Sequence, residues 1–153
     1  MKTQSQLVML ITLLIFSYSF SEECKYGSAV VDSIISVYDG DTFRCNINGF
    51  PPIIGENISI RFKHIDTPEI RGSSKCEKKD AYKIRDYVEK RLRSAKTIVL
   101  KNIGRPKYFR LMAEVFVDGV DLGKELVRLG YAYKYEGGTK KDWVCIKDST
   151  SRQ

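Results

Sequence analysis

Three short segments of the chain place charged side chains near the ends of predicted strands. The first reads DGDT at residues 39–42, the second reads RFKHIDTPE at residues 61–69, and the third reads KYFR at residues 107–110. Alone, the first is typical of an ordinary hairpin turn, and the second of a strand end with a solvated loop. Together they supply carboxylates and guanidinium groups in a combination that suits a phosphate group.

The residue types in these segments fit the hydrolysis of a phosphodiester. Asp41 and Asp66 offer hard carboxylate oxygens, which suit calcium or magnesium better than zinc. Arg61 and Arg110 can hold phosphate oxygens and stabilise the extra negative charge of a five-coordinate transition state. Glu69 then remains to activate or orient the attacking water. The single histidine and the lack of a CxxC pair also argue against zinc.

The elements that must position these residues can be predicted from periodicity. Strands are expected where apolar residues alternate or β-branched residues gather, at residues 29–38, 42–47, 58–65, 97–101 and 110–117. Residues 49–57, which contain two prolines and two glycines, are expected to form a loop.

Two helices complete the pattern. Apolar residues at helical spacing predict one over residues 77–95, and Asp121 can cap a second that Gly130 ends. The predicted fold class is α+β, mainly β. It is a five-stranded OB-fold barrel with a helix between strands 3 and 4 and a second helix after strand 5.

The lone histidine invites a catalytic role, but its position in the third strand favours packing. Strict alternation over residues 58–65 directs His64 inward with Ile60 and Phe62, and Arg61 and Lys63 outward. We therefore expect His64 to be a core or strand-packing residue.

The first 21 residues are predicted to be a signal peptide. Lys2 precedes an apolar run from Leu7 to Phe20, which is short for a membrane span and ends in small residues. An uncleaved anchor is the alternative. Residues 22–153 would form the domain, with a core at 29–135 and a tail at 136–153. A periplasmic or secreted location, without stable membrane association after cleavage, is the expectation.

The distribution of charge points to a polyanionic partner. The chain has a formal charge of +7, and residues 75–110 hold 13 basic and 4 acidic side chains. A basic block of this kind favours nucleic acid or an anionic membrane surface. A solvated, lysine-rich helix is the plain alternative.

The ordered motifs resemble the staphylococcal nuclease (thermonuclease) family in its short, exported bacterial form. DGDT is followed by R-x4-DTPE, then KY-x-R, then a DG turn and a helix reading ELVRLGYA, over about residues 30–135. The resemblance implies a calcium-dependent endonuclease that hydrolyses DNA and RNA, leaves 3′-phosphate ends and acts as a monomer.

The resemblance also assigns roles to individual residues. Asp41 and Asp66 correspond to the carboxylates that bind calcium, and Thr67 to a residue that lends its backbone carbonyl. The residues assigned to catalysis are Arg61, Glu69 and Arg110. Those assigned to the substrate are Lys107 and Tyr108, with Tyr133 and Tyr135 as aromatic surfaces for base stacking. For Tyr131, packing against the barrel is expected instead.

The four cysteines suggest disulfides in an exported domain. Cys76 follows the catalytic loop and Cys145 ends a tail that should return near it, so we hypothesise a Cys76–Cys145 bridge. Cys24–Cys45 would follow by elimination, although Cys45 lies on an inward face and a buried free thiol is the alternative.

Two other functions compete with the nuclease interpretation. Barrels of this type also bind nucleic acid without cutting it, and a cationic protein can act on membranes or anionic polymers. Glu69 argues against pure binding, because a carboxylate beside a phosphate repels it. The predicted helix at residues 77–95 needs its apolar face for the core, which argues against membrane action.

Overall fold

The computed structural model describes residues 26–71, 74–105 and 109–146. The predicted signal peptide, Cys24, Lys107 and Tyr108 lie outside these ranges. In the part of the chain that is described, no helix is both long enough and apolar enough to cross a membrane.

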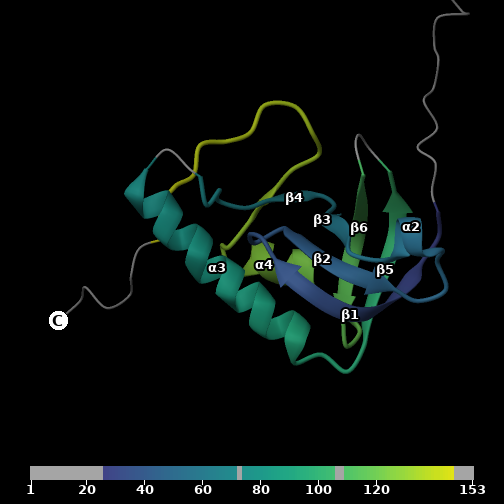
Figure 1. Ribbon diagram of the computed structural model, residues 1–153. Coiled ribbons are helices and arrows are strands. Elements are labelled where there is room, and N and C mark those ends of the chain that lie inside the picture. The colour runs from purple at the N-terminus through teal and green to yellow at the C-terminus, as the bar shows by residue number, and fades with distance from the viewer. Residues whose placement is uncertain (1–25, 72–73, 106–108, 147–153) are drawn as a thin grey trace, which may run out of the picture.

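Five strands close into the predicted barrel (Figure 1). They are β1 (Ala29–Val37), β2 (Thr42–Ile47), β3 (Ile58–Phe62), β5 (Ile98–Gly104) and β6 (Arg110–Val117). Strand β1 pairs antiparallel with β2 and β5, β2 pairs with β3, and β5 pairs with β6. A parallel pairing of β3 with β6 completes the ring, so the OB-fold prediction is confirmed.

The remaining helices and strands are packed around the barrel or extend its sheet. They are α2 (Pro52–Gly55), β4 (Ile65–Asp66), α3 (Lys75–Arg93), β7 (Val120–Asp121), α4 (Leu122–Arg128) and β8 (Tyr133–Lys134). The positions of α3 and α4 in the chain are as predicted, and Asp121 caps α4 by accepting a hydrogen bond from the Lys124 amide. The predicted loop at 49–57 contains the single turn α2, whose first residue is a proline and needs no amide partner.

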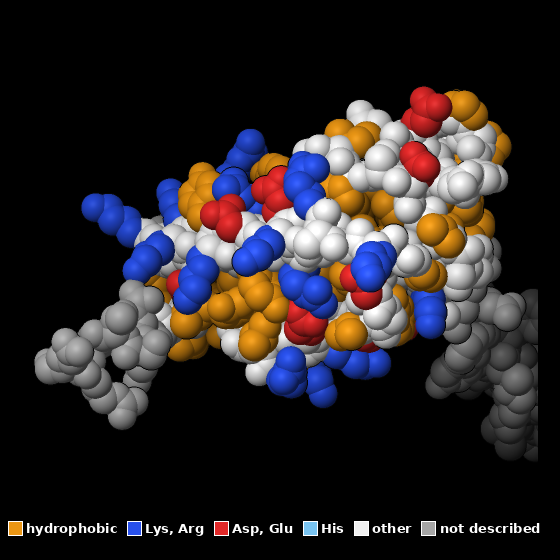
Figure 2. All heavy atoms as spheres, turned by 90° about the horizontal axis from the view of Figure 1, so that it is seen from below, with side chains coloured by type: hydrophobic (Ala, Val, Ile, Leu, Met, Phe, Trp, Pro, Cys, Tyr) orange, Lys and Arg blue, Asp and Glu red, His pale blue; other side chains and the backbone are white. Residues whose placement is uncertain are grey.

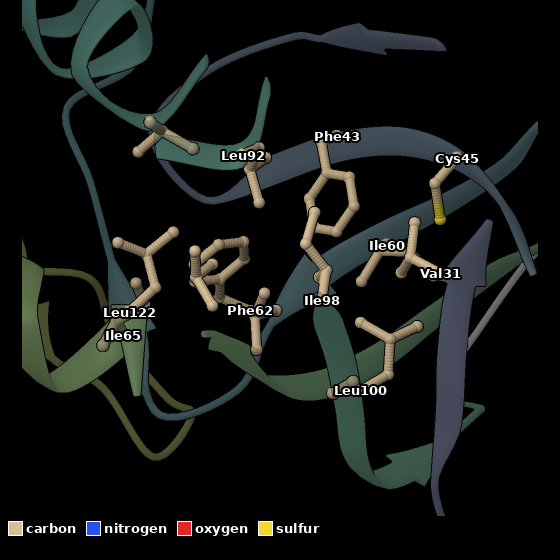
Figure 3. Close-up of a cluster of buried hydrophobic side chains, with 14 of the residues drawn as sticks. Val31, Phe43, Cys45, Ile60, Phe62, Ile65, Leu92, Ile98, Leu100 and Leu122 are labelled. Carbon is tan, nitrogen blue, oxygen red and sulfur yellow. The ribbon is translucent and has the colours of Figure 1, made fainter. Parts of the chain in front are cut away.

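The core lies inside the barrel and beneath α3. Phe43 and Phe62 meet edge to face, with ring centroids 5.8 Å apart, and Leu92 reaches them from α3 (Figure 3). Ile84 and Val88 of the same helix are also fully buried. Burial of this one face holds α3 against the barrel.

The third strand is shorter than predicted, and the prediction for His64 is wrong. Strand β3 ends at Phe62, and His64 adopts a positive φ of 63°. This bend reverses the alternation. Lys63 is therefore only 8% exposed, whereas the His64 side chain is 52% exposed and its Nδ1 lies 2.7 Å from Glu136 Oε2. Pairing with β6 continues one residue past the end of β3, up to the bend, through a hydrogen bond from the Lys63 amide to the Ala113 carbonyl.

Helices α3 and α4 are joined by a polar cluster around Glu125. The Tyr87 hydroxyl donates to Glu125 Oε1 at 2.5 Å, and Arg91 donates to both carboxylate oxygens, at 2.9 and 3.1 Å. These hydrogen bonds, above all those from Arg91, lower the pKa of Glu125 below its usual 4.5. A group with a lowered folded pKa stabilises the protein above its usual pKa, and this contribution is lost as the pH falls through the folded value.

We predict that Glu125→Gln lowers the free energy of unfolding at pH 7 by about 1–3 kcal/mol, because two donors lose a charged acceptor. Chemical denaturation at pH 7 and at about pH 3 measures the effect, which should shrink at the lower pH. Glu89→Gln, which breaks the exposed Arg93–Glu89 pair, is the control and should cost about 0.5 kcal/mol or less. An equal loss for Glu125→Gln at both pH values would contradict this account.

Candidate active site

One arginine joins the two aspartates that the sequence singled out. Arg61 Nη1 lies 2.6 Å from Asp41 Oδ1, and Arg61 Nη2 lies 2.9 Å from Asp66 Oδ1. The register of β2 with β3 places Thr42 opposite Arg61, which brings the DGDT turn beside the guanidinium. The side chains of Arg61 and Asp41 are only 13% and 2% exposed. The predicted charged residues of two distant segments thus meet in a nearly buried cluster.

A third carboxylate, for which the sequence predicted only a place in a turn, belongs to this cluster. Asp39 is buried, and its Oδ1 accepts a hydrogen bond from the Asp41 amide at 3.0 Å. Burial raises the pKa of Asp39. Burial also raises the pKa of Asp41 to about 7, against the opposing effect of Arg61 and with a further contribution from Asp39. Three carboxylates around one guanidinium leave negative charge that a further cation would neutralise.

The charged form of Arg61 is stabilised by the aspartates in turn. Burial alone would lower the pKa of Arg61, but the charges of Asp41 and Asp66 outweigh burial and raise it. Arg61 is therefore a permanent cation, available to a phosphate as well as to the aspartates.

Close packing holds the DGDT turn against the loop that follows β4. The Thr67 amide donates to Asp41 Oδ2 at 3.2 Å, and Thr67 is buried. A Cβ atom on Gly40 would lie 2.6 Å from Ile84 Cγ2 and 2.9 Å from Thr67 Cγ2. Glycine is required at this position because the turn, α3 and Thr67 leave no room for a side chain.

Glu69 lies at the open side of the cluster. Its carboxylate is 45% exposed, and its Oε1 is 2.7 Å from Lys140 Nζ. The same ammonium lies 2.8 Å from Asp66 Oδ1. Burial lowers the pKa of Lys140, but the hydrogen bonds to Asp66 and Glu69 outweigh it and raise the pKa.

Lys140 reaches the cluster because the tail returns to the start of α3. The hypothesised Cys76–Cys145 disulfide is present. In Figure 1 the tail arches over β4 before it reaches the first turn of the helix. Cys45 is a free, buried thiol whose pKa burial raises to about 12, so of the two alternatives for Cys45 the structure shows the buried free thiol; Cys24 lies outside the described residues.

Arg110 is the second predicted phosphate-binding arginine, and it opens β6. It pairs with Ser59 of β3, two residues before Arg61, and alternation places both arginines on the outward face of the barrel. Their Cα atoms are therefore separated by about 7 Å along the strand direction, a spacing that two long side chains can bridge.

The predicted substrate tyrosines are engaged by the tail itself. The Tyr133 ring lies 5.0 Å from that of Trp143, and its hydroxyl accepts from the Val144 amide. The Tyr135 hydroxyl donates to the Gly138 carbonyl at 2.8 Å. Tyr131 packs against the core, as expected, and its ring meets that of Tyr87 on α3 edge to face. Substrate contacts by Tyr133 and Tyr135 stay predictions.

Comparison with known proteins finds a family and named relatives that this chain resembles. A model of the family described as staphylococcal nuclease homologue matches residues 59–147. The chain is 32% identical over 115 residues to the SPbeta prophage-derived endonuclease YokF of Bacillus subtilis (strain 168), covering 67% of this chain and 34% of that protein. It is 31% identical over 114 residues to endonuclease YncB of the same organism, covering 67% of this chain and 48% of that protein.

The chain belongs to the staphylococcal nuclease family. It spans about a third of the length of one of these relatives and about half of the other. The match includes Arg61, Asp66, Glu69 and the tail with Lys140, so the charge cluster lies largely within the shared region.

We predict that Arg61→Gln lowers the free energy of unfolding by about 3–5 kcal/mol, because it leaves the buried Asp41 without its counter-charge. Thermal or chemical unfolding measures this. Arg44→Gln is the matched control on the neighbouring strand, since the Arg44 guanidinium is exposed and bonds only Asn57 among the described residues. Equal stability of the two variants would contradict the structural role given to Arg61.

Proposed function

We propose that this protein is a nuclease that hydrolyses phosphodiester bonds of DNA and RNA in a calcium-dependent reaction and leaves 3′-phosphate ends. One observation carries the proposal. Arg61 is held between Asp41 and Asp66, and the carboxylate of Glu69 lies at the open side of the same cluster. Membership of the staphylococcal nuclease family supports it.

The donor set of the cluster fits a hard divalent cation. Asp41 and Asp66 offer carboxylate oxygens and Thr67 a backbone carbonyl, and calcium prefers oxygen ligands of these kinds. The excess of buried carboxylates over guanidinium groups favours the same conclusion. Bound there, calcium would supply positive charge to polarise the scissile phosphate.

The protein's own side chains would bind the phosphate and activate the water. Arg61 and Arg110 hold the phosphate oxygens and stabilise the charge that develops on them. Glu69 orients the attacking water and accepts its proton. Attack of the water on phosphorus breaks the bond between phosphorus and the 5′ oxygen, which takes up a proton from water and leaves as an alcohol, so that the phosphate remains on the 3′ oxygen of the preceding nucleotide.

A basic surface accounts for the choice of a polyanionic substrate. Residues 75–110, which include α3, carry 13 basic and 4 acidic side chains. Figure 2 shows lysine and arginine side chains spread over the face seen from below, on the side of α3, with acidic side chains between them. Such a surface attracts the nucleic acid backbone without reading its sequence, which fits action on both DNA and RNA.

A periplasmic or secreted location and action as a monomer are part of the proposal. The Cys76–Cys145 disulfide supports the proposed location, because disulfides persist in oxidising compartments.

We predict that Glu69→Gln lowers kcat by about 10²–10⁴-fold, because the carboxylate that orients water and accepts its proton is lost. Steady-state cleavage of single-stranded DNA measures this. The half-exposed side chain contributes little to the fold, so thermal stability should stay nearly unchanged. Glu89→Gln on the exposed face of α3 is the control and should cleave normally. A near-normal rate for Glu69→Gln would contradict the assigned role.

We predict cleavage of single-stranded DNA, duplex DNA and RNA with calcium, and none with excess chelator. End-group analysis should find 3′-phosphates. Asp41→Asn should raise the calcium concentration needed for half-maximal rate by about tenfold or more, because a charged ligand is lost. Tight binding of nucleic acid without cleavage under every metal condition would instead support an OB-fold module that only binds.

A further inference from the structure

We propose that Lys140 is a tethered cation of the active site that pairs with Asp66 and Glu69 and competes with the divalent metal for these carboxylates. The inference rests on the proposed metal dependence and adds a residue from the tail to the site. It makes the metal affinity of the protein depend on a lysine that is 71 residues away from Glu69 in the sequence.

The contacts of Lys140 overlap with those that a metal would need. Its ammonium lies 2.8 Å from Asp66 Oδ1 and 2.7 Å from Glu69 Oε1. Asp66 Oδ1 also accepts from Arg61 Nη2 at 2.9 Å. One carboxylate oxygen is therefore shared by two cations, and a metal that binds this oxygen must displace at least one of them.

Of the two cations, Lys140 is the easier to displace. Arg61 is 13% exposed and is held by Asp41 as well as by Asp66, so its removal would strand a buried charge. The Lys140 side chain is 43% exposed and its ammonium is readily rehydrated, so breaking its pairs costs little. Metal binding is thus expected to move Lys140 and leave Arg61 in place.

Both ends of the segment that carries Lys140 are fixed. Before it, β8 pairs with β4, with Tyr133 opposite Asp66. After it, Cys145 is bonded to Cys76.

A buried carboxylate on α3 strengthens the second anchor. Asp80 Oδ2 accepts from Trp143 Nε1 and from the Ile146 amide, both at 2.9 Å. A loop closed at both ends keeps the ammonium at high effective concentration beside the carboxylates, so its competition with the metal is stronger than that of a free cation.

Calcium binding to the purified protein, measured by isothermal titration calorimetry without nucleic acid, tests the proposal. Lys140→Gln should bind calcium about three- to tenfold more tightly than the wild type, because the competing ion pairs are lost. Lys141→Gln removes the same charge from the neighbouring residue and should change the affinity by about twofold or less, since among the described residues Lys141 forms no ion pair with Asp66 or Glu69. Lys140→Arg, which keeps the cation, should stay close to the wild type.

Equal or weaker calcium binding by Lys140→Gln, with clear binding by the wild type, would overturn the role of Lys140 and leave the proposed nuclease function standing. Absence of calcium binding by all variants would overturn the proposed metal dependence and this inference with it. Tighter binding by Lys141→Gln to the same extent as Lys140→Gln would also overturn it, because the effect would then come from net charge alone.

The tether is tested by a double-mutant cycle. Replacement of both Cys76 and Cys145 by serine removes one anchor of the tail and leaves the hydrogen bonds to Asp80 in place, and the circular dichroism spectrum checks that the barrel remains folded. We expect tighter calcium binding than in the wild type, and no further gain when the disulfide is removed from Lys140→Gln. If the two changes altered the calcium affinity independently and additively, the claim that the anchored tail holds Lys140 beside the carboxylates would be contradicted.

Discussion

The contact of one nearly buried guanidinium with two aspartates is the interaction on which the site depends. Arg61 on β3 holds Asp41 from the turn before β2 and Asp66 from β4, so three chain segments meet at a single group. Charges this poorly exposed are tolerated only when paired, which makes the geometry of each carboxylate dependent on the arginine. The barrel supplies the register that brings them together, and the close fit at Gly40 keeps the turn in contact with α3.

The same cluster holds more carboxylates than guanidinium groups. Asp39 adds a third carboxylate, and burial among like charges raises the pKa of Asp41 to about 7. Protein sites with such an excess of negative charge attract a cation. We propose that two cations, Lys140 and calcium, occupy the position beside Asp66 and Glu69 at different times. Lys140 pairs with Asp66 and Glu69, and calcium would replace it at these carboxylates. The disulfide at the end of the tail thereby connects the stability of the fold to the chemistry of the site.

Much of this arrangement was predictable because its signals are local. Strands β2 and β6 have the predicted bounds, since alternation and turn residues act over a few positions. His64 was misplaced because periodicity does not report a bend that reverses the parity of a strand. Lys140 was missed altogether: nothing near residue 140 in the sequence marks it, and only the return of the tail to α3 brings it beside Asp66.

The most direct test of the central claim is a crystal structure of the protein with calcium and a short phosphorothioate oligonucleotide that resists cleavage. The account predicts calcium bound by Asp41, Asp66 and the Thr67 carbonyl, with the scissile phosphate contacted by Arg61. Calcium bound elsewhere, or a phosphate remote from the Arg61 cluster, would contradict it.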